Sequence, residues 1–85
     1  MLLECINMHK EDIKVGDIVK VIFVKYGKHL VWGEVFEVST DEHGLPGTWV
    51  SLKVTGGDMN DWQVKIMVKE HINVMVPINN VIQVL

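Results

Sequence analysis

Residues 15–21 read VGDIVKV, and this short stretch decides the fold that we expect for the chain. A Gly-Asp turn signal is followed by alternating side chains, with Val19 and Val21 on one face and Lys20 on the other. Alternation with a period of two is typical of a half-buried β-strand, and Gly-Asp marks the turn before it. We therefore expect the first strand over residues 17–25.

The same pattern recurs along the chain, with one irregularity. Residues 32–38 read WGEVFEV, and neither face of this stretch is cleanly apolar, which predicts a bulge or a strong bend near Phe36. Residues 76–85 read VPINNVIQVL, which predicts a 3₁₀ turn and then a last strand. The expected elements are a short leading strand over residues 2–8, strands over residues 30–39, 48–55, 62–69, 72–76 and 81–85, and the 3₁₀ turn over residues 77–80.

The composition favours an all-β protein. Valine occurs fifteen times and isoleucine eight times, while alanine is absent. β-Branched side chains pack well on pleated sheets and lose rotamer freedom in helices. Short strands joined by polar turns suggest a sandwich or a barrel, and a length of 85 residues favours one barrel. We expect a single domain over residues 1–85, with a leading strand or loop over residues 1–14 and the barrel over residues 15–85.

Two resemblances support this interpretation. Residues 76–81 are similar to the proline-containing 3₁₀ turn that precedes the last strand of SH3 domains. Residues 16–21 followed by residues 33–38 resemble the opening of KOW-type modules, which occur in ribosomal proteins and transcription elongation factors. The resemblance implies an SH3-like β-barrel of five to six short antiparallel strands. Such barrels are mostly binding scaffolds, and their fold alone does not fix the ligand.

The charge balance disfavours specific nucleic-acid recognition. The chain has eight lysines, no arginine and eleven acidic residues, which gives a net charge of −3. Nucleic-acid binding usually rests on a basic surface, and arginine is the preferred residue for bidentate contacts to phosphate and guanine. The lack of alanine and arginine would also follow from an AT-rich genome, such as that of a bacteriophage or a low-GC bacterium.

Nothing in the sequence indicates secretion, a membrane span or catalysis. Cys5 is the only cysteine, so an intrachain disulfide is excluded. The first residues lack the basic region of a signal peptide, and no run approaches the roughly 20 apolar residues of a membrane span. The histidines lack the spacing of metal ligands. We expect a cytoplasmic, non-catalytic protein with no cofactor and no metal.

The leading functional hypothesis is a small accessory or regulatory protein that docks on a protein partner. Val50, Leu52 and Val54 occupy the inward face of their strand, so Trp49 is expected to point outward. Met67 and Met75 are predicted to lie on adjacent strands of a hairpin and to point outward as well. Exposed apolar patches mark protein interfaces, and methionine surfaces adapt to partners. The expected protein interface consists of Trp49, Met67 and Met75.

Two alternatives remain open from the sequence. The first is a KOW-like nucleic-acid-binding module in transcription or translation, in which lysines bind phosphates and aromatic rings stack on bases. Its candidate residues are Lys20, Lys25, Tyr26, Lys28 and Trp32. The second is a structural subunit that associates with itself, for example through residues 2–8.

Overall fold

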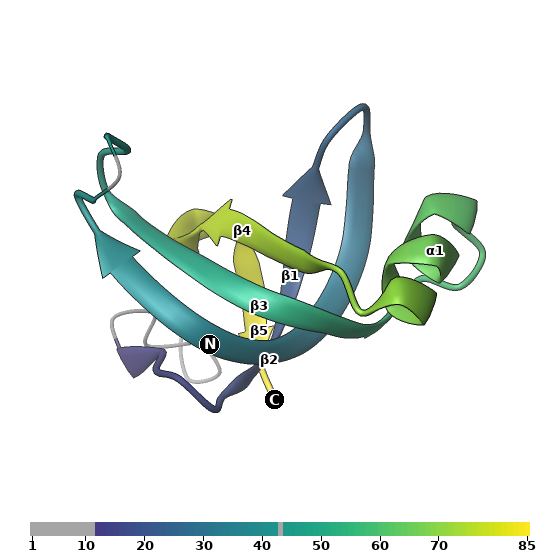
Figure 1. The fold of residues 1–85 in the computed structure, drawn as a ribbon, viewed down its shortest axis with the longest axis horizontal. Coiled ribbons are helices and arrows are strands. Elements are labelled where there is room, and N and C mark those ends of the chain that lie inside the picture. Colours follow the sequence, from purple (N-terminus) through teal and green to yellow (C-terminus); the bar gives the residue numbers. More distant parts are fainter. Residues whose placement is uncertain (1–11, 43) are drawn as a thin grey trace, which may run out of the picture.

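The computed structural model describes residues 12–42 and 44–85. In this part of the chain, five antiparallel strands form one sheet that is accompanied by a short helix (Figure 1). The expected leading strand over residues 2–8, together with Cys5, lies outside the described residues. The elements are β1 (Ile18–Val24), β2 (Lys28–Thr40), β3 (Thr48–Gly57), α1 (Trp62–Glu70), β4 (Asn73–Pro77), the 3₁₀ turn η3 (Ile78–Asn80) and β5 (Val81–Val84).

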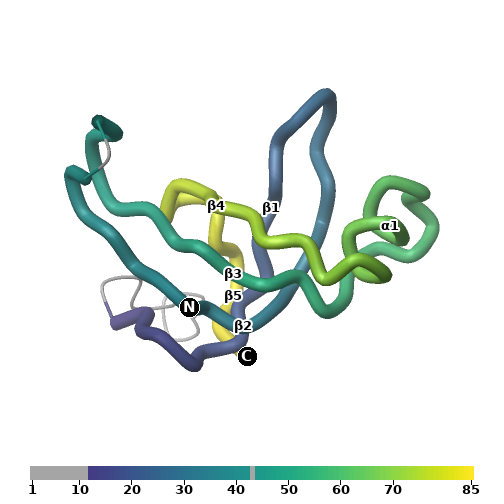
Figure 2. The backbone as a smooth tube through the Cα atoms, viewed as in Figure 1, coloured from purple at the N-terminus to yellow at the C-terminus, as the bar shows by residue number. Residues whose placement is uncertain are grey.

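The sheet follows the order β4-β3-β2-β1-β5. β1 to β4 form a meander, and β5 returns after the 3₁₀ turn to pair with β1. The sheet is strongly bent, so that β4 crosses in front of β1 in Figure 2. β4 and β5 are the two edges, and no pairing between them is found in the described residues. The mostly β class and the 3₁₀ turn before the last strand are confirmed, whereas strand pairing does not close the sheet into the expected barrel.

The core is built almost entirely from valine. The inward residues predicted for β3, Val50, Leu52 and Val54, are confirmed as fully buried. β-Branched side chains suit this environment because they have few rotamers to lose on a pleated surface. The buried apolar residues are Ile13, Val19, Val21, Val31, Val35, Val50, Leu52, Val54, Val64, Val74, Val76 and Val81.

The bulge predicted near Phe36 is confirmed. Val35 pairs with Leu52 and Glu37 pairs with Ser51, so the register shifts by one residue at Phe36. A bulge places two residues of one strand opposite one residue of its partner and bends the strand. Phe36 is consequently turned outward and is exposed.

The predicted strand over residues 62–69 is wrong, because these residues form the helix α1. The Asp61 side chain accepts a hydrogen bond from the Gln63 backbone N–H, which is the usual N-cap contact. His71 ends the helix in the left-handed conformation, with a φ of 53°. Both ends of the helix are therefore fixed by local contacts that alternation of side chains does not reveal.

The inward residues of α1 follow helical spacing. Val64 is buried, and Met67 and Val68 pack against the core from the next turn, as expected for positions i, i+3 and i+4. Ile66 lies on another side of the helix and is exposed. Ile72, the first residue of the strand predicted over residues 72–76, lies before β4 and is exposed.

Gly57 permits the close approach of α1 to the sheet, and this contact gives a testable prediction. A Cβ atom at this position would lie 2.5 Å from Val64 Cγ1 and 2.6 Å from the Leu30 backbone oxygen. We expect Gly57→Ala to lower the free energy of unfolding by about 1–3 kcal/mol, the usual cost of overpacking. Urea unfolding measures this change.

Thr55→Ala, at an exposed position of the same strand, is the control and should change stability by less than about 0.5 kcal/mol. An unchanged or higher stability of Gly57→Ala would contradict the contact.

Candidate functional site

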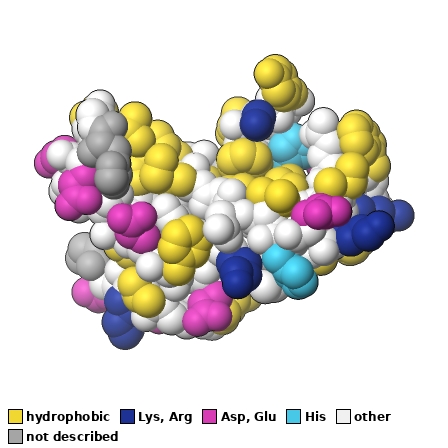
Figure 3. All heavy atoms as spheres, in the orientation of Figure 1, with side chains coloured by type: hydrophobic (Ala, Val, Ile, Leu, Met, Phe, Trp, Pro, Cys, Tyr) yellow, Lys and Arg dark blue, Asp and Glu magenta, His cyan; other side chains and the backbone are white. Residues whose placement is uncertain are grey.

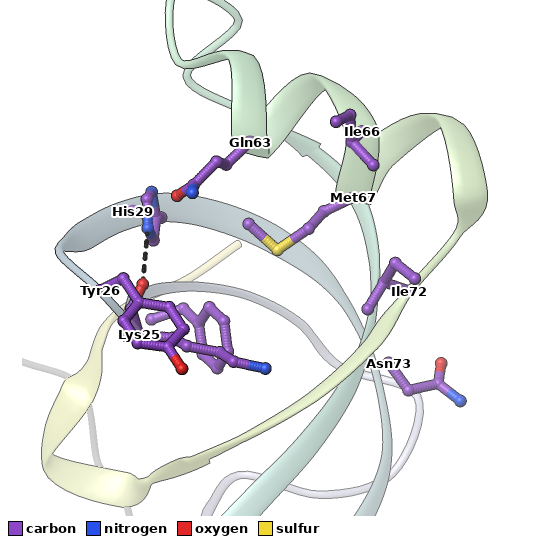
Figure 4. Close-up of a pocket in the computed structure, with 9 residues that line it drawn as sticks. Lys25, Tyr26, His29, Gln63, Ile66, Met67, Ile72 and Asn73 are labelled. Carbon is purple, nitrogen blue, oxygen red and sulfur yellow. Dashed lines mark hydrogen bonds between the residues drawn. The ribbon is translucent and has the colours of Figure 1, made fainter.

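A groove lies between the turn that joins β1 to β2 and the helix α1 (Figure 4). Its volume is about 350 Å³, at the lower end of the range of small-ligand sites. Figure 3 shows that hydrophobic side chains gather on the hairpin tip and on the helix that flank it. The residues that line the groove are Phe23, Lys25, Tyr26, His29, Gln63, Ile66, Met67, Ile72 and Asn73.

Tyr26 stands at the rim of the groove in an unusual backbone conformation. Its φ is 56°, in the left-handed region that bulky residues rarely adopt. The turn around it is held by a hydrogen bond from the Lys25 N–H to the Gly27 oxygen, at 2.9 Å. The side chain is 91% exposed. Strained backbone conformations of this kind cluster at ligand-binding positions. Here the turn places an exposed aromatic ring at the rim of the groove.

His29 connects the two sides of the groove. Its Nδ1 lies 2.6 Å from Asp61 Oδ2, and its Nε2 lies 3.1 Å from the Lys25 backbone oxygen. The residue is only 7% exposed. Both ring nitrogens therefore face oxygen acceptors, and a neutral imidazole carries only one N–H. The imidazolium form, with two N–H groups, satisfies both acceptors.

The Asp61 carboxylate contacts both β2 and the start of α1. Its Oδ2 accepts from His29, and its Oδ1 accepts the backbone N–H of Gln63 at 3.0 Å. The hydrogen bond to Asp61 raises the pKa of His29, an effect that burial opposes and that the Lys25 carbonyl reinforces. The same hydrogen bond lowers the pKa of Asp61, against a smaller opposing effect of burial. The pair is therefore an ion pair that joins β2 to the start of α1.

The groove combines an apolar lining with a histidine whose two ring nitrogens already have hydrogen-bond partners. Both nitrogens of His29 are already bonded, so the ring is not poised beside a nucleophile as a general base. Within residues 12–42 and 44–85, no group of three or more His, Cys, Asp or Glu side chains could hold a metal ion. No helix in the same ranges is long and apolar enough to cross a membrane. What the groove offers is an apolar surface with a few polar groups around it.

The structure separates the expected protein interface into two parts. Met67 lines the groove from α1, and not from a strand as predicted. Trp49 and Met75 lie on the outer side of β3 and β4, where Met75 is exposed and pairs with Ser51. The Trp49 indole is half-buried and donates to the Pro46 oxygen at 2.9 Å. The three residues therefore do not form one patch.

The candidate residues of the nucleic-acid alternative also lie in two separate places. Lys25 and Tyr26 line the groove, and Lys28 begins β2. Lys20 and Trp32 pair across β1 and β2, and the Lys20 ammonium lies 5.4 Å from the centroid of the Trp32 ring. The indole also lies over Gly56, where any side chain would collide with it. A ring that is in contact with both a lysine and a glycine backbone offers little surface for a stacked base.

Sequence reasoning missed much of the groove. Nothing in the sequence pairs His29 with Asp61, because the two residues are 32 positions apart. Phe23 and Ile66 fall within the strands predicted over residues 17–25 and 62–69, where alternation of side chains does not indicate a groove. Only the Asp61-Trp62-Gln63 run carried a signal, because aspartate is a favoured helix N-cap.

Comparison of the chain with protein-family models, with curated proteins and with solved structures finds no match.

The ion pair predicts a stability maximum in mildly acidic solution. The raised pKa of His29 means that its contribution is complete below the ordinary value of 6.5 and is lost as the pH rises through the folded-state pKa. The lowered pKa of Asp61 means that its contribution is present above 3.8 and is lost as the pH falls through the folded-state pKa. We therefore expect the free energy of unfolding to be highest between these two ordinary values and to decline on the alkaline side.

Urea unfolding as a function of pH tests this expectation. His29→Gln should flatten the decline above pH 6.5, because the titrating ring is gone. His71→Asn is the matched control, because it replaces an exposed histidine at the end of α1 with a residue that tolerates the left-handed conformation. A decline that persists unchanged in His29→Gln would refute the assignment.

Proposed function

We propose that this chain is a non-catalytic docking module that holds a segment of a protein partner in the groove between the β1–β2 turn and α1. The observation that carries the proposal is the preformed apolar groove with the strained, exposed Tyr26 at its rim. Tyrosine supplies a large, rigid contact surface and is enriched at protein interfaces. The proposed role is that of a small accessory or regulatory protein.

The apolar surface is continuous across the groove. Ile66 is 48% exposed and Ile72 is 40% exposed, and both line the groove with Tyr26. Met67 lies between them and the hairpin in Figure 4, and its flexible thioether side chain can adapt to different surfaces. Exposed apolar side chains that adjoin one cavity are expected of a docking surface more than of a free surface.

We also propose that the sheet belongs to the SH3-like class. In support of this, β5 follows a proline and a 3₁₀ turn and then pairs with β1, as the sequence resemblance implied. The proposal concerns the scaffold only, because the same scaffold serves many unrelated ligands. A nucleic-acid role has less support, since Lys20 and Trp32 lie apart from the turn that carries Lys25 and Lys28, and Trp32 is in contact with Lys20 and Gly56.

Capture experiments with two matched variants test the docking proposal. Ile66→Glu places a charge in the groove, and Ile82→Glu places the same charge on β5, where Ile82 is 49% exposed and does not line the groove. Tagged proteins are used to capture partners from native lysate with and without nuclease, and circular dichroism checks that each variant is folded. We expect a discrete protein that survives nuclease, that is lost with Ile66→Glu and that is retained with Ile82→Glu.

Three results would contradict the proposal. The first is a partner that both folded variants retain, and the second is a partner that both lose. The third is captured material that disappears with nuclease, which would favour the nucleic-acid alternative.

A further inference from the structure

We infer that the groove selects a protein segment in which a large apolar side chain lies next to a carboxylate. This inference rests on the proposed docking function and adds the chemistry of the ligand. It combines two observations about the groove, which are the apolar character of its two walls and the set of polar groups left unpaired at its edge.

The two walls of the groove suit one large apolar side chain. Phe23 and Tyr26 come from the hairpin, and Ile66, Met67 and Ile72 come from the helix and the residue before β4. Figure 4 shows the Met67 side chain extending from the helix toward the hairpin that carries Tyr26, with Ile66 farther away on the helix. A volume of about 350 Å³ is small for a whole ligand of drug size. It is enough for a side chain and the backbone on either side of it.

The polar groups of the groove are mostly donors. The nine residues that line it include Lys25 and no aspartate or glutamate. The nearby Asp61 carboxylate is already occupied, with one oxygen bonded to His29 and the other to the Gln63 N–H. His29 has both nitrogens bonded, so it has no free N–H for a ligand.

Three polar side chains remain available around the apolar surface. Among the described residues, no hydrogen-bond partner is found for the side chains of Lys25, Gln63 and Asn73. Lysine offers only donors, and each amide offers two. A carboxylate can pair with the Lys25 ammonium and can also accept from an amide N–H. A cationic ligand would instead meet Lys25 with no carboxylate to balance it.

The expected selectivity is modest because Lys25 is exposed. Ion pairs at exposed positions contribute little in water. Removal of the ligand charge should therefore weaken binding roughly two- to fivefold. Added salt should reduce this difference, because it screens charges at the surface.

A titration with two small probes tests the inference on the full chain. The probes are N-acetyl-L-leucine, which carries a carboxylate, and N-acetyl-L-leucinamide, which has the same side chain and no charge. Proton–nitrogen NMR spectra of the labelled protein follow both titrations. We expect both probes to shift the amide signals of residues 25–29 and 63–67, and the acid to bind roughly two- to fivefold more tightly.

Two matched lysine variants distinguish an effect of Lys25 itself from an effect of the overall charge of the protein. Lys25→Met should abolish the preference for the acid over the amide, because the ammonium that pairs with the carboxylate is gone. Lys28→Met is the control, because Lys28 lies across the same turn but does not line the groove. A preference that both variants lose would reflect the overall charge and would overturn the inference.

The remaining outcomes distinguish this inference from the docking proposal. Equal affinity for the two probes, or tighter binding of the amide, would overturn the carboxylate preference and leave the apolar groove as a docking site. If neither probe shifts the amide signals of the groove residues, both proposals are overturned. Shifts with the expected preference for the acid, lost only in Lys25→Met, would support them together.

Discussion

The ion pair between His29 and Asp61 is the contact on which the groove depends. α1 has nine residues, and Val64 is its only fully buried residue. A helix of this length is not stable on its own in water, so its position must come from contacts with the sheet. The carboxylate of Asp61 supplies two of these contacts, because it caps the helix and binds His29 of β2. The same histidine holds the Lys25 carbonyl, so one side chain positions both the turn and the helix.

The close approach of α1 to the sheet also requires positions in the sheet that carry no side chain. Gly57, at the end of β3, lies where Val64 of α1 approaches the backbone of β2. Gly33 similarly lies against the Lys53 backbone, at a point where β2 and β3 change register. Absence of a side chain at these positions allows the strands to bend sharply and the helix to pack closely. The groove is therefore a consequence of the bend of the sheet as well as of the ion pair.

Local patterns in the sequence predicted most of the sheet but not the groove. Alternation of apolar and polar side chains located all five strands of the described sheet, and the mixed faces of residues 32–38 located the bulge at Phe36. The same criterion failed for residues 62–69, because Val64, Ile66 and Val68 alternate as in a strand while Val64, Met67 and Val68 also fit a helix. Closure of the sheet and the pairing of His29 with Asp61 depend on contacts between distant residues, which no local pattern specifies.

The two walls of the groove are linked through His29, whose pKa is raised above its ordinary value by the hydrogen bond to Asp61. When His29 loses its proton, its ring can donate to only one of the two oxygens that it now holds. Either the turn that carries Tyr26 or the start of α1 then loses a contact. A ligand of the proposed docking groove that contacts both walls is expected to bind more tightly when His29 is protonated, because both contacts are then present. By linkage, binding of such a ligand raises the pKa of His29 further, and a rise in pH weakens binding to the same extent.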